Sequence, residues 1–493
     1  MAESRNDTKN GSSKTCLMIT IVGMNSFLVQ LNGCATSGNL LVKNKVVRII
    51  GSEYSETNSW NQNLSSGQVN NNNNKSLSYG CRPVAALDNE KVNGWMDAYF
   101  DCLSNKMTSE QCTLYRLHDD DLIDLMYECE ERRYKPSTSV CFVVKHPKLR
   151  EIFAANFRDR IVQHWICLRI EPLFEKRFVM QGDVSWNCRK ERGTQKAVLA
   201  LRRDILDVSD NYTKKAWVGR FDIKSFFMSI DIRILEKYAV GFVRKYYKGK
   251  DLELLVYLLT VTIRNRPQDN CIKRGDITLW DKLPKHKSLF HVERYRGMPI
   301  GNITSQLLAN FYMSFLDDYM IGLCKGIGAR YERFVDDFAV VCRQKEDVCF
   351  LRDKADIFLK RYLNLEMHKD KVYIQDVTKG VYFVGAVIKM ERIYLANRTV
   401  GGIIDVLKDL QGFLVRIKDF RIADAYQLEH YLASINSYFG FMARKNTYGI
   451  KRKIIKECPL FFKFFYVKGR FESVRLKKEF CVKYQLIKME NYG

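Results

Sequence analysis

Residues 330–342 read RYERFVDDFAVVC and place two adjacent aspartates inside an apolar run. Asp336 and Asp337 stand where the pattern predicts a buried strand, as one half of a hairpin whose other half is GARYERF at 328–334. Aspartate is depleted in strands and is almost never fully buried without a partner. Basic side chains, hydrogen bonds or a metal ion must therefore compensate the two charges.

A second acid follows an apolar strand earlier in the chain. Asp222 ends AWVGRFD and is followed by Ile223-Lys224-Ser225-Phe226-Phe227. Mg²⁺ takes one or two carboxylates and completes its shell with water and phosphate oxygens. Two strand-end acids that converge can hold a metal pair for phosphoryl transfer, in which one ion activates the attacking hydroxyl and the other stabilises the leaving oxygen. The alternative is that the aspartate pair is solvated surface.

The charge of the chain points to an acidic partner. Among 493 residues, 80 Lys and Arg stand against 56 Asp and Glu, which gives a net charge of +24. Nucleic acid is the first candidate for the partner and an anionic membrane surface the second. A basic protein without such a partner is the remaining alternative. The hydrophobic and charged fractions are those of an ordinary folded protein, which excludes wholesale disorder.

The N-terminal region differs in texture from the rest of the chain. Residues 1–85 are poor in charge and rich in Asn, Ser and Gly, and they include the run Asn70 to Asn74, which favours a disordered linker. The apolar stretch at 16–37 is interrupted by polar residues, so we interpret it as a short strand or helix, with an export signal as the alternative. The 15 cysteines contain no C-x-x-C pair, which argues for a reducing compartment and against a disulfide framework or a structural zinc site.

Hydrophobic periodicity predicts an α+β fold. Helical spacing runs from Trp95 to Tyr134, two strands with a turn at Pro147 follow, and helices then alternate with strands, as expected for a sheet covered on one face by helices. After residue 400 the pattern is helical, and its apolar stripe predicts a core seam: Ile403, Leu407, Leu410, Leu414 and Ile417. The tail 448–480 interleaves bases with aromatics, which suits nucleic acid.

Several segments, in order along the chain, resemble the motifs of reverse transcriptases. FDIKSFF (221–227), GMPIGNITSQLLANFY (297–312), FVDD (334–337), LNLEMHKDK (363–371) and VYFVGAVI (381–388) resemble successive palm motifs. KHPKLREIFAANFRDRIVQH (145–164) and SWNCRKERGTQKAV (185–198) resemble the fingers strands and the segment that links fingers to palm. The resemblance implies a right-hand polymerase with an Asn-rich segment (1–85), fingers (86–215), a palm with an antiparallel sheet (216–400), and a basic helical thumb and tail (401–493).

The resemblance also implies a metal site. Asp222 and Asp336 would be the metal-bridging carboxylates, with Asp337 beside them and the backbone carbonyl of Ile223 as a further ligand. Two Mg²⁺ ions are implied, with Mn²⁺ as a substitute. Lys371 would protonate the pyrophosphate leaving group, although Lys369 is close enough in sequence to compete.

Nucleotide-binding residues follow from the same resemblance. Lys145, Lys148 and Arg150 would meet the triphosphate, and Arg150 is favoured because arginine binds phosphate with two parallel hydrogen bonds. Phe227 would exclude a 2′-hydroxyl, and its alternative is a core aromatic. In the second palm motif, Ile300 and Gly301, followed by Ser305-Gln306, resemble the enzymes of bacterial diversity-generating retroelements. Without a Gln before the glycine, we expect looser selection of the incoming nucleotide and misincorporation opposite template adenine.

Two biological settings remain open for such an enzyme, which is expected in the bacterial cytoplasm without a membrane partner. The first is a diversity-generating retroelement, with an RNA template, a DNA or RNA primer, dNTPs, and a small basic accessory protein or structured noncoding RNA. Residues 58–84 resemble the end of the variable proteins that such elements diversify. The second is an anti-phage defence reverse transcriptase that copies a noncoding RNA. A third, different class is a non-catalytic RNA-binding module on an inactive polymerase scaffold. The insertion at 264–296 offers a basic surface for RNA under any of these readings.

Overall fold

A computed structural model describes residues 89–104, 121–145, 148–443, 447–482 and 484–486, together with the backbone of four strands between residues 17 and 50. The Asn run at 70–74, the predicted turn at Pro147 and part of the predicted helical region (105–120) lie outside the described residues. The chain divides into two compact units, Met1–Lys135 with Phe157–Trp165, and Pro136–Asn156 with Ile166–Gly493. Each unit is described by itself.

The first unit combines a small sheet with helices. Its strands pair antiparallel in the order β2-β1-β4-β3 and are β1 (Leu17–Thr20), β2 (Phe27–Val29), β3 (Gly38–Val42) and β4 (Lys45–Ile50). Its helices are α1 (Asn89–Leu103), α3 (Asp121–Glu130) and the first turns of α4 (Phe157–Met180). Trp95 on α1 stacks on Trp165 on α4 with ring centroids 5.2 Å apart, and both rings are buried. The α1–α4 contact is therefore part of the core of this unit.

The central sheet of the second unit has four antiparallel strands in the order β11-β7-β10-β9. These strands are β7 (Trp217–Phe221), β9 (Arg330–Phe334), β10 (Asp337–Cys342) and β11 (Tyr373–Asp376). The predicted hairpin at 328–342 is confirmed, because β9 and β10 pair from Asp337 opposite Phe334 to Val341 opposite Arg330. Only Val335 and Asp336 separate the two strands.

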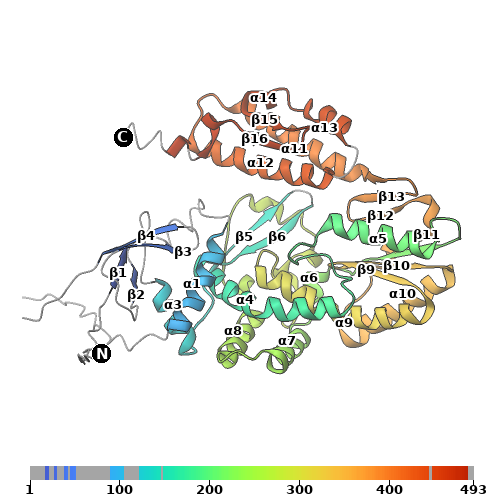
Figure 1. Ribbon diagram of the computed structural model, residues 1–493, viewed down its shortest axis with the longest axis horizontal. Helices are drawn as coiled ribbons and strands as arrows, with labels where there is room; N and C mark the ends of the chain where they lie inside the picture. The colour runs from blue at the N-terminus through green and yellow to red at the C-terminus, as the bar shows by residue number, and fades with distance from the viewer. Residues whose placement is uncertain are drawn as a thin grey trace, which may run out of the picture. The chain divides into compact units, whose positions relative to one another are not determined.

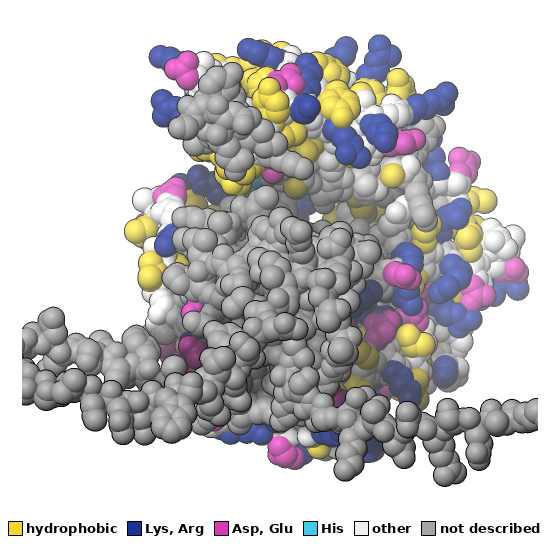
Figure 2. All heavy atoms as spheres, turned by 60° about the vertical axis from the view of Figure 1, so that its left-hand side comes forward, with side chains coloured by type: hydrophobic (Ala, Val, Ile, Leu, Met, Phe, Trp, Pro, Cys, Tyr) yellow, Lys and Arg dark blue, Asp and Glu magenta, His cyan; other side chains and the backbone are white. Residues whose placement is uncertain are grey.

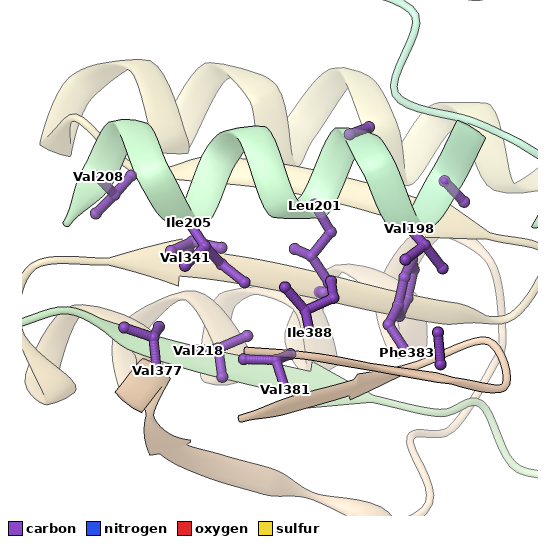
Figure 3. Packing of buried hydrophobic residues seen from close by; sticks show 14 of the residues in the cluster. Val198, Leu201, Ile205, Val208, Val218, Val341, Val377, Val381, Phe383 and Ile388 are labelled. Atoms are coloured by element: carbon purple, nitrogen blue, oxygen red, sulfur yellow. The ribbon is translucent and has the colours of Figure 1, made fainter. Parts of the chain in front are cut away.

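Packing covers both faces of this sheet, which corrects the expectation of a single covered face. Val218 and Val341 point toward α5 (Thr194–Val208), whose residues Val198, Leu201, Ile205 and Val208 face the strands in Figure 3. A Cβ on Gly219, which points the other way, would lie 2.5 Å from Val348 of α10 (Lys345–Tyr362). Figure 1 shows α5 and α10 on opposite sides of the strands. A strand buried on both faces explains the continuous apolar run after Asp337.

Further helices of the second unit agree with the predicted alternation of helices and strands and are α7 (Ile232–Tyr246), α8 (Leu252–Arg264) and α9 (Ile303–Ile327). The short helix α6 (Phe226–Ser229) lies directly after the Asp222 loop. The two predicted strands around residue 147 are also confirmed, as β5 (Ser139–Val144) and β6 (Arg150–Ala154). A third strand, β8 (Cys271–Lys273) from the insertion at 264–296, pairs parallel with β5. The insertion is therefore part of the sheet that carries the predicted triphosphate-binding residues.

A second small sheet joins the palm region to the C-terminal helices. It contains β12 (Val381–Phe383), β13 (Ala386–Ile388) and β14 (Ile393–Leu395), and the palm-like segment 381–388 supplies the first two of these strands. The helices that follow are α11 (Asn397–Arg416), α12 (Ile422–Met442), α13 (Tyr448–Ile455) and α14 (Phe461–Phe464). The stripe on α11 is confirmed as a core seam, because four of its five residues are buried and Ile417 packs against them.

The C-terminal region departs from the purely helical expectation at one point. Strands β15 (Phe465–Lys468) and β16 (Ser473–Leu476) form a hairpin within the tail. The aromatic residues that the sequence shows there serve partly as core, since Phe461, Phe464 and Phe465 are buried. Among the residues that the structure describes, no helix is both long enough and apolar enough to cross a membrane.

Candidate active site

Strand register brings the predicted carboxylates together. In the β7–β10 pair, Phe221 lies opposite Phe338, and the next step of the same antiparallel register places Asp222 opposite Asp337. Side chains alternate along a strand, so Asp222 and Asp337 share the face that carries Arg220 and Ala339. Two acids distant in sequence thus become cross-strand neighbours, and Asp336 stands beside them in the turn.

The turn that carries Asp336 is held in an unusual conformation. Val335 has a φ of 59°, which is uncommon for any residue other than glycine and strained for a β-branched one. Arg333 braces this turn, because its guanidinium donates to the carbonyl oxygen of Val335 at 3.0 Å and is itself anchored on Asp317 at 2.6 and 2.7 Å. Strain of this kind persists only where surrounding contacts determine the conformation.

Crowding of the carboxylates shifts their protonation. Burial and the neighbouring charges of Asp337 and Asp222 raise the pKa of Asp336 to about 7. Burial and the charge of Asp222 likewise raise the pKa of Asp337, which Arg220, Lys371 and Lys148 oppose. The ionised pair is therefore costly in the protein by itself, and a bound cation would relieve that cost.

Basic side chains surround the acids. Lys371, at the end of the 3-10 helix Lys369–Lys371, forms an ion pair with the Asp222 carboxylate, and its backbone N–H donates to the carbonyl of His368 at 3.1 Å. His368 in turn donates its backbone N–H to the Asp222 carbonyl at 2.8 Å. The two backbone bonds hold the loop that carries Lys371 against the Asp222 loop. Of the two lysines that the sequence left open, Lys371 is the one that the structure places at Asp222.

The predicted triphosphate-binding residues separate into two groups. Lys148 and Arg150 act electrostatically on the carboxylates, Lys148 on Asp337 and Arg150 on Asp336. Lys145 instead forms an ion pair with Asp276 of the insertion at 3.8 Å. Lys148 also lies among other cations. Burial and then the charges of these neighbours lower its pKa, and the neighbours are Arg398, Lys371, Arg150 and Lys287. A group of cations that repel one another is suited to a polyanion such as a triphosphate.

The predicted nucleotide gate belongs to an apolar cluster. Phe227 and Ile300 pack with Phe153 of β6, Cys141 and Met228. The Ile300 carbonyl accepts the backbone N–H of Phe153 at 2.8 Å, so the second palm motif is attached to the fingers strand. These contacts agree with a gate and equally with the alternative of a core aromatic, and the role of Phe227 stays a prediction.

Gly301 is required by this attachment. Its φ is 125°, and a Cβ there would lie 2.8 Å from the Phe153 carbonyl oxygen and 2.9 Å from the Ile152 side chain. Any other residue would force the motif away from β6. Gln306, one turn into α9, is exposed and its Oε1 accepts a weak hydrogen bond from the Cys188 thiol at 3.6 Å. The structure thus places Gln306 beside the segment that links fingers to palm.

Arg220 is a site residue that the sequence reasoning missed. It lies two residues before Asp222 on the same face, and its guanidinium donates to the Tyr382 carbonyl at 2.9 Å and lies over the Tyr382 ring at 4.7 Å. Arg220 therefore joins the catalytic strand to β12 while its charge acts on Asp337. Its alternation with Asp222 and Val218 on one face of a strand was the available signal. Arg398 and Lys287 gave no such signal, because they are far from the motifs in sequence.

The donor chemistry fits a hard divalent cation. Within the described parts of the chain, no group of three or more His, Cys, Asp or Glu side chains is arranged to hold a metal ion. Asp222 is turned toward the Lys371 ammonium. Mg²⁺ nevertheless needs only one or two carboxylates, and Asp336 and Asp337 are half-buried carboxylates with raised pKa values. Asp222, Asp336 and Asp337 are therefore the residues that would hold it.

Comparison with known proteins places this geometry in a family. The model of the family described as "Reverse transcriptase (RNA-dependent DNA polymerase)" matches residues 143–388. Residues 143–388 form a reverse transcriptase domain. The α+β right-hand polymerase fold expected from the sequence follows with it, since the domain contains both the fingers strands and the palm sheet.

Two curated bacterial proteins are similar to the chain that carries this reverse transcriptase domain. Protein YkfC of Escherichia coli (strain K12) is 25% identical over 280 residues, which cover 51% of this chain and 66% of YkfC. The group II intron-encoded protein LtrA of Lactococcus lactis subsp. cremoris is 21% identical over 392 residues, which cover 61% of this chain and 59% of LtrA. The chain thus spans less than two thirds of the length of these relatives.

Solved structures similar to this chain include two of telomerase. Apo telomerase from Candida tropicalis is 12% identical with a TM-score of 0.39, and the match covers 72% of this chain and 65% of that one. Telomerase from Candida albicans in complex with a fragment of telomeric RNA is 14% identical with a TM-score of 0.37, over 66% of this chain and 56% of that one. The assignment of the reverse transcriptase domain rests on the family match.

A basic and aromatic surface follows the reverse transcriptase domain. Lys and Arg side chains alternate with hydrophobic ones over the C-terminal elements in Figure 2. Tyr448, Phe462 and Tyr466 are about half exposed there, at 48%, 53% and 46%. Exposed rings near cations are suited to stacking and charge contacts with a nucleic-acid strand, and binding by the tail stays a prediction.

Proposed function

We propose that the protein is an RNA-directed DNA polymerase, which extends a primer on an RNA template by adding deoxynucleotides. The observation that carries this proposal is the cross-strand placement of Asp222 beside Asp337, with Asp336 in the adjoining turn, inside a reverse transcriptase domain. Their mutually raised pKa values favour the binding of a cation at this position.

Each part of the site has a defined task in this reaction. Divalent cations held by the three aspartates would lower the pKa of the primer 3′-hydroxyl and stabilise charge on the leaving oxygen. Arg150 and Lys148 bind the triphosphate from the β6 side. Lys371, already held at Asp222, supplies a proton to the departing pyrophosphate. Phe227, fixed in the apolar cluster, restricts the space at the sugar.

Primer extension tests the activity. Purified full-length protein is given a DNA primer on an RNA template, dNTPs and Mg²⁺, and incorporation is compared with that of Asp222→Asn. Asp356→Asn is the matched control, because Asp356 is a carboxylate on α10 whose only described partner is Lys360 at 2.6 Å. We expect incorporation by the natural protein and by the control. Equal incorporation by Asp222→Asn, or none by the natural protein, would overturn the proposal.

We infer further that the enzyme serves a diversity-generating retroelement and copies its template with frequent errors. The sequence support is Ile300 in place of a glutamine and the Asn-rich segment at 58–84. The structural support is that Ile300 sits in the apolar cluster with Phe227, where it offers no side-chain hydrogen bond to the nascent pair. Selection then depends more on shape, and a mismatched nucleotide leaves fewer groups unpaired.

Sequencing of the cDNA that copurifies with the protein from its host tests this role. A repeat-derived template and mutations concentrated at template adenines are expected for the retroelement. A cDNA copied faithfully from one noncoding RNA would assign the enzyme to anti-phage defence instead. Error rates of the natural protein and of Ile300→Gln, measured on one template, provide the second readout, and equal rates would remove Ile300 as the cause of misincorporation.

A further inference from the structure

A cavity of about 540 Å³ opens between α7, the C-terminal end of α8 and residues 294–297. Its lining contains none of the residues assigned above to metal or nucleotide binding, and one wall belongs to the insertion at 264–296. We call it the arginine pocket, because six of its lining side chains are cationic: Arg233, Lys237, Arg264, Arg266, Arg294 and Arg296.

Acidic partners neutralise only part of this charge. The four paired cations and their partners are Arg264 with Glu236 at 2.6 Å, Arg233 with Asp231 at 2.9 Å, Arg266 with Asp269 at 2.7 Å and Arg296 with Glu293 at 3.8 Å. Lys237 and Arg294 form no ion pair with a carboxylate of the described residues. The arginine pocket therefore keeps a positive surplus, which favours an anionic ligand.

An exposed aromatic residue stands within the same lining. The Tyr295 side chain is 48% exposed, and the guanidinium groups of Arg233 and Arg294 lie 5.1 and 5.6 Å from its ring centroid. A half-exposed ring with guanidinium groups near it can stack on a nucleobase, and the same groups can contact the phosphates beside that base. Inorganic anions and acidic peptides would use the charge but leave the ring without a function.

The backbone holds this ring in place. The Tyr295 carbonyl accepts the N–H of Ile232 at 2.9 Å, and the N–H of Gly297 donates to the Ile230 carbonyl at 2.9 Å. Arg296 adds bonds from its guanidinium to the carbonyls of Ser229 and Asn364 at 2.9 and 2.8 Å. Because the segment is already ordered, binding at Tyr295 does not have to order it.

The same segment leads to the residues that are predicted to contact the incoming nucleotide. One residue beyond Gly297, the Met298 N–H donates to the Phe227 carbonyl at 2.8 Å, and Ile300 and Gly301 follow. RNA bound at Tyr295 would thus contact the segment that leads into the second palm motif. It would not occupy the site of the three aspartates.

We propose that the arginine pocket binds a single-stranded segment of RNA, with one base stacked on Tyr295 and its phosphates on Arg294 and Lys237. This inference rests on the proposed function in taking the ligand to be the RNA that the enzyme copies or carries. An unpaired part of that RNA is held at the arginine pocket, away from the three aspartates. The primer end therefore remains free to react.

Fluorescence anisotropy of a labelled single-stranded RNA of about 20 nucleotides, titrated with full-length protein, tests the proposal. Tyr295→Ala should weaken binding about 5- to 150-fold, which is the range for loss of one stacked base. Tyr295→Phe keeps the ring and should bind within about twofold of the natural protein. Arg294→Gln should lower the slope of log affinity against log salt by about 0.7, as expected for one phosphate contact on a single strand.

Phe350→Ala is the matched control, because Phe350 is an aromatic on α10 with 42% exposure and Lys354 at 5.4 Å, but it lines no described cavity. It should bind like the natural protein. Unchanged affinity in Tyr295→Ala would overturn the proposal. So would a loss on Arg294→Gln without a loss on Tyr295→Ala, since an acidic peptide would fit such a purely electrostatic site.

Primer extension on a minimal RNA–DNA hybrid separates this inference from the proposed activity. Tyr295→Ala should extend that hybrid at the natural rate when the unpaired template overhang is only a few nucleotides long, because so short an overhang leaves no further RNA strand for the arginine pocket. Failure of the natural protein to extend it would contradict the polymerase assignment, and the RNA-binding comparison would still decide the pocket.

Discussion

Two groups of charged side chains at the β9–β10 hairpin contrast with each other. Arg333 and Asp317 are both fully buried, and their two hydrogen bonds of 2.6 and 2.7 Å, together with one from the Tyr331 hydroxyl at 2.8 Å, satisfy the carboxylate. A few residues along, Asp336 and Asp337 share their surroundings with Asp222, and the three carboxylates repel one another.

The difference separates structural charge from functional charge. Protein groups compensate Asp317 completely, so its ion pair serves to hold the hairpin and the Val335 turn. At the turn, burial and mutual repulsion raise the pKa values of Asp336 and Asp337, although the surrounding lysines and arginines oppose the shift. Buried ion pairs add little net stability but are costly to break, whereas an uncompensated acidic group is retained for what it binds. Replacement of an aspartate by asparagine should therefore lower activity at Asp336 and lower stability at Asp317.

Loss of a turn carboxylate should have the largest effect, and that effect is on activity. In the proposed mechanism Asp336→Asn removes an oxygen ligand of the metal that the transition state requires, so we expect primer extension to fall about 10³-fold or more. Single-turnover incorporation on an RNA template measures it. A decrease of less than about tenfold would remove Asp336 from the catalytic set.

Loss of the buried pair should affect stability instead. Asp317→Asn leaves the Arg333 charge buried without its partner, which should lower the free energy of unfolding by about 3–5 kcal/mol. Urea denaturation measures this value. Asp356→Asn breaks the exposed pair with Lys360 and should change it by less than about 1 kcal/mol. Similar values for the two variants would contradict the structural role of Asp317.

Replacement of the lysine at Asp222 should have an intermediate effect. Lys371→Met removes the proposed proton donor to pyrophosphate and should lower the incorporation rate about 10²-fold. Lys369 is exposed, and Lys369→Met should leave the rate close to natural. If instead Lys369→Met is the slower variant, the assignment of the two lysines is reversed.

The smallest expected effect is on the pH dependence of stability when no divalent cation is present. Because the folded protein raises the pKa of Asp336 to about 7, it binds this proton more tightly than the unfolded chain does. The stabilisation that the folded protein gains from this proton is fully present below about pH 4 and is lost as the pH rises through about 7. Asp336→Asn should therefore be more stable than the natural protein at pH 8 in EDTA, by about 2 kcal/mol, because coupling to the other aspartates shares the full shift.

Thermal or urea unfolding of both proteins at pH 4 and pH 8 checks this prediction, since other titrating groups cancel in the difference. Added Mg²⁺ should stabilise the natural protein more than Asp336→Asn. A difference that does not change between the two pH values would show that Asp336 titrates normally.

Several parts of the site were predictable because they depend on local pattern. The strand ends at Asp222 and Asp337, the hairpin and the stripe on α11 all follow from the spacing of apolar residues. Lys145 shows where such reasoning ends, because its position beside Lys148 in the sequence gives no indication that it pairs with Asp276. The prediction that helices cover only one face of the sheet was wrong for a related reason. The sequence of the linking segment 185–198 gave no sign that α5 packs on the second face.

Periodicity and the order of the motifs were enough to determine the α+β class, the strand-end acids and the reverse transcriptase domain, because these depend on short stretches of chain. Only the tertiary structure decided that Asp337 is the acid opposite Asp222, that Lys371 and not Lys369 reaches that carboxylate, and that Arg220, Arg398 and Lys287 join the site. Strand register and loop packing set these neighbours, and both are sums of many weak contacts between residues far apart in the sequence.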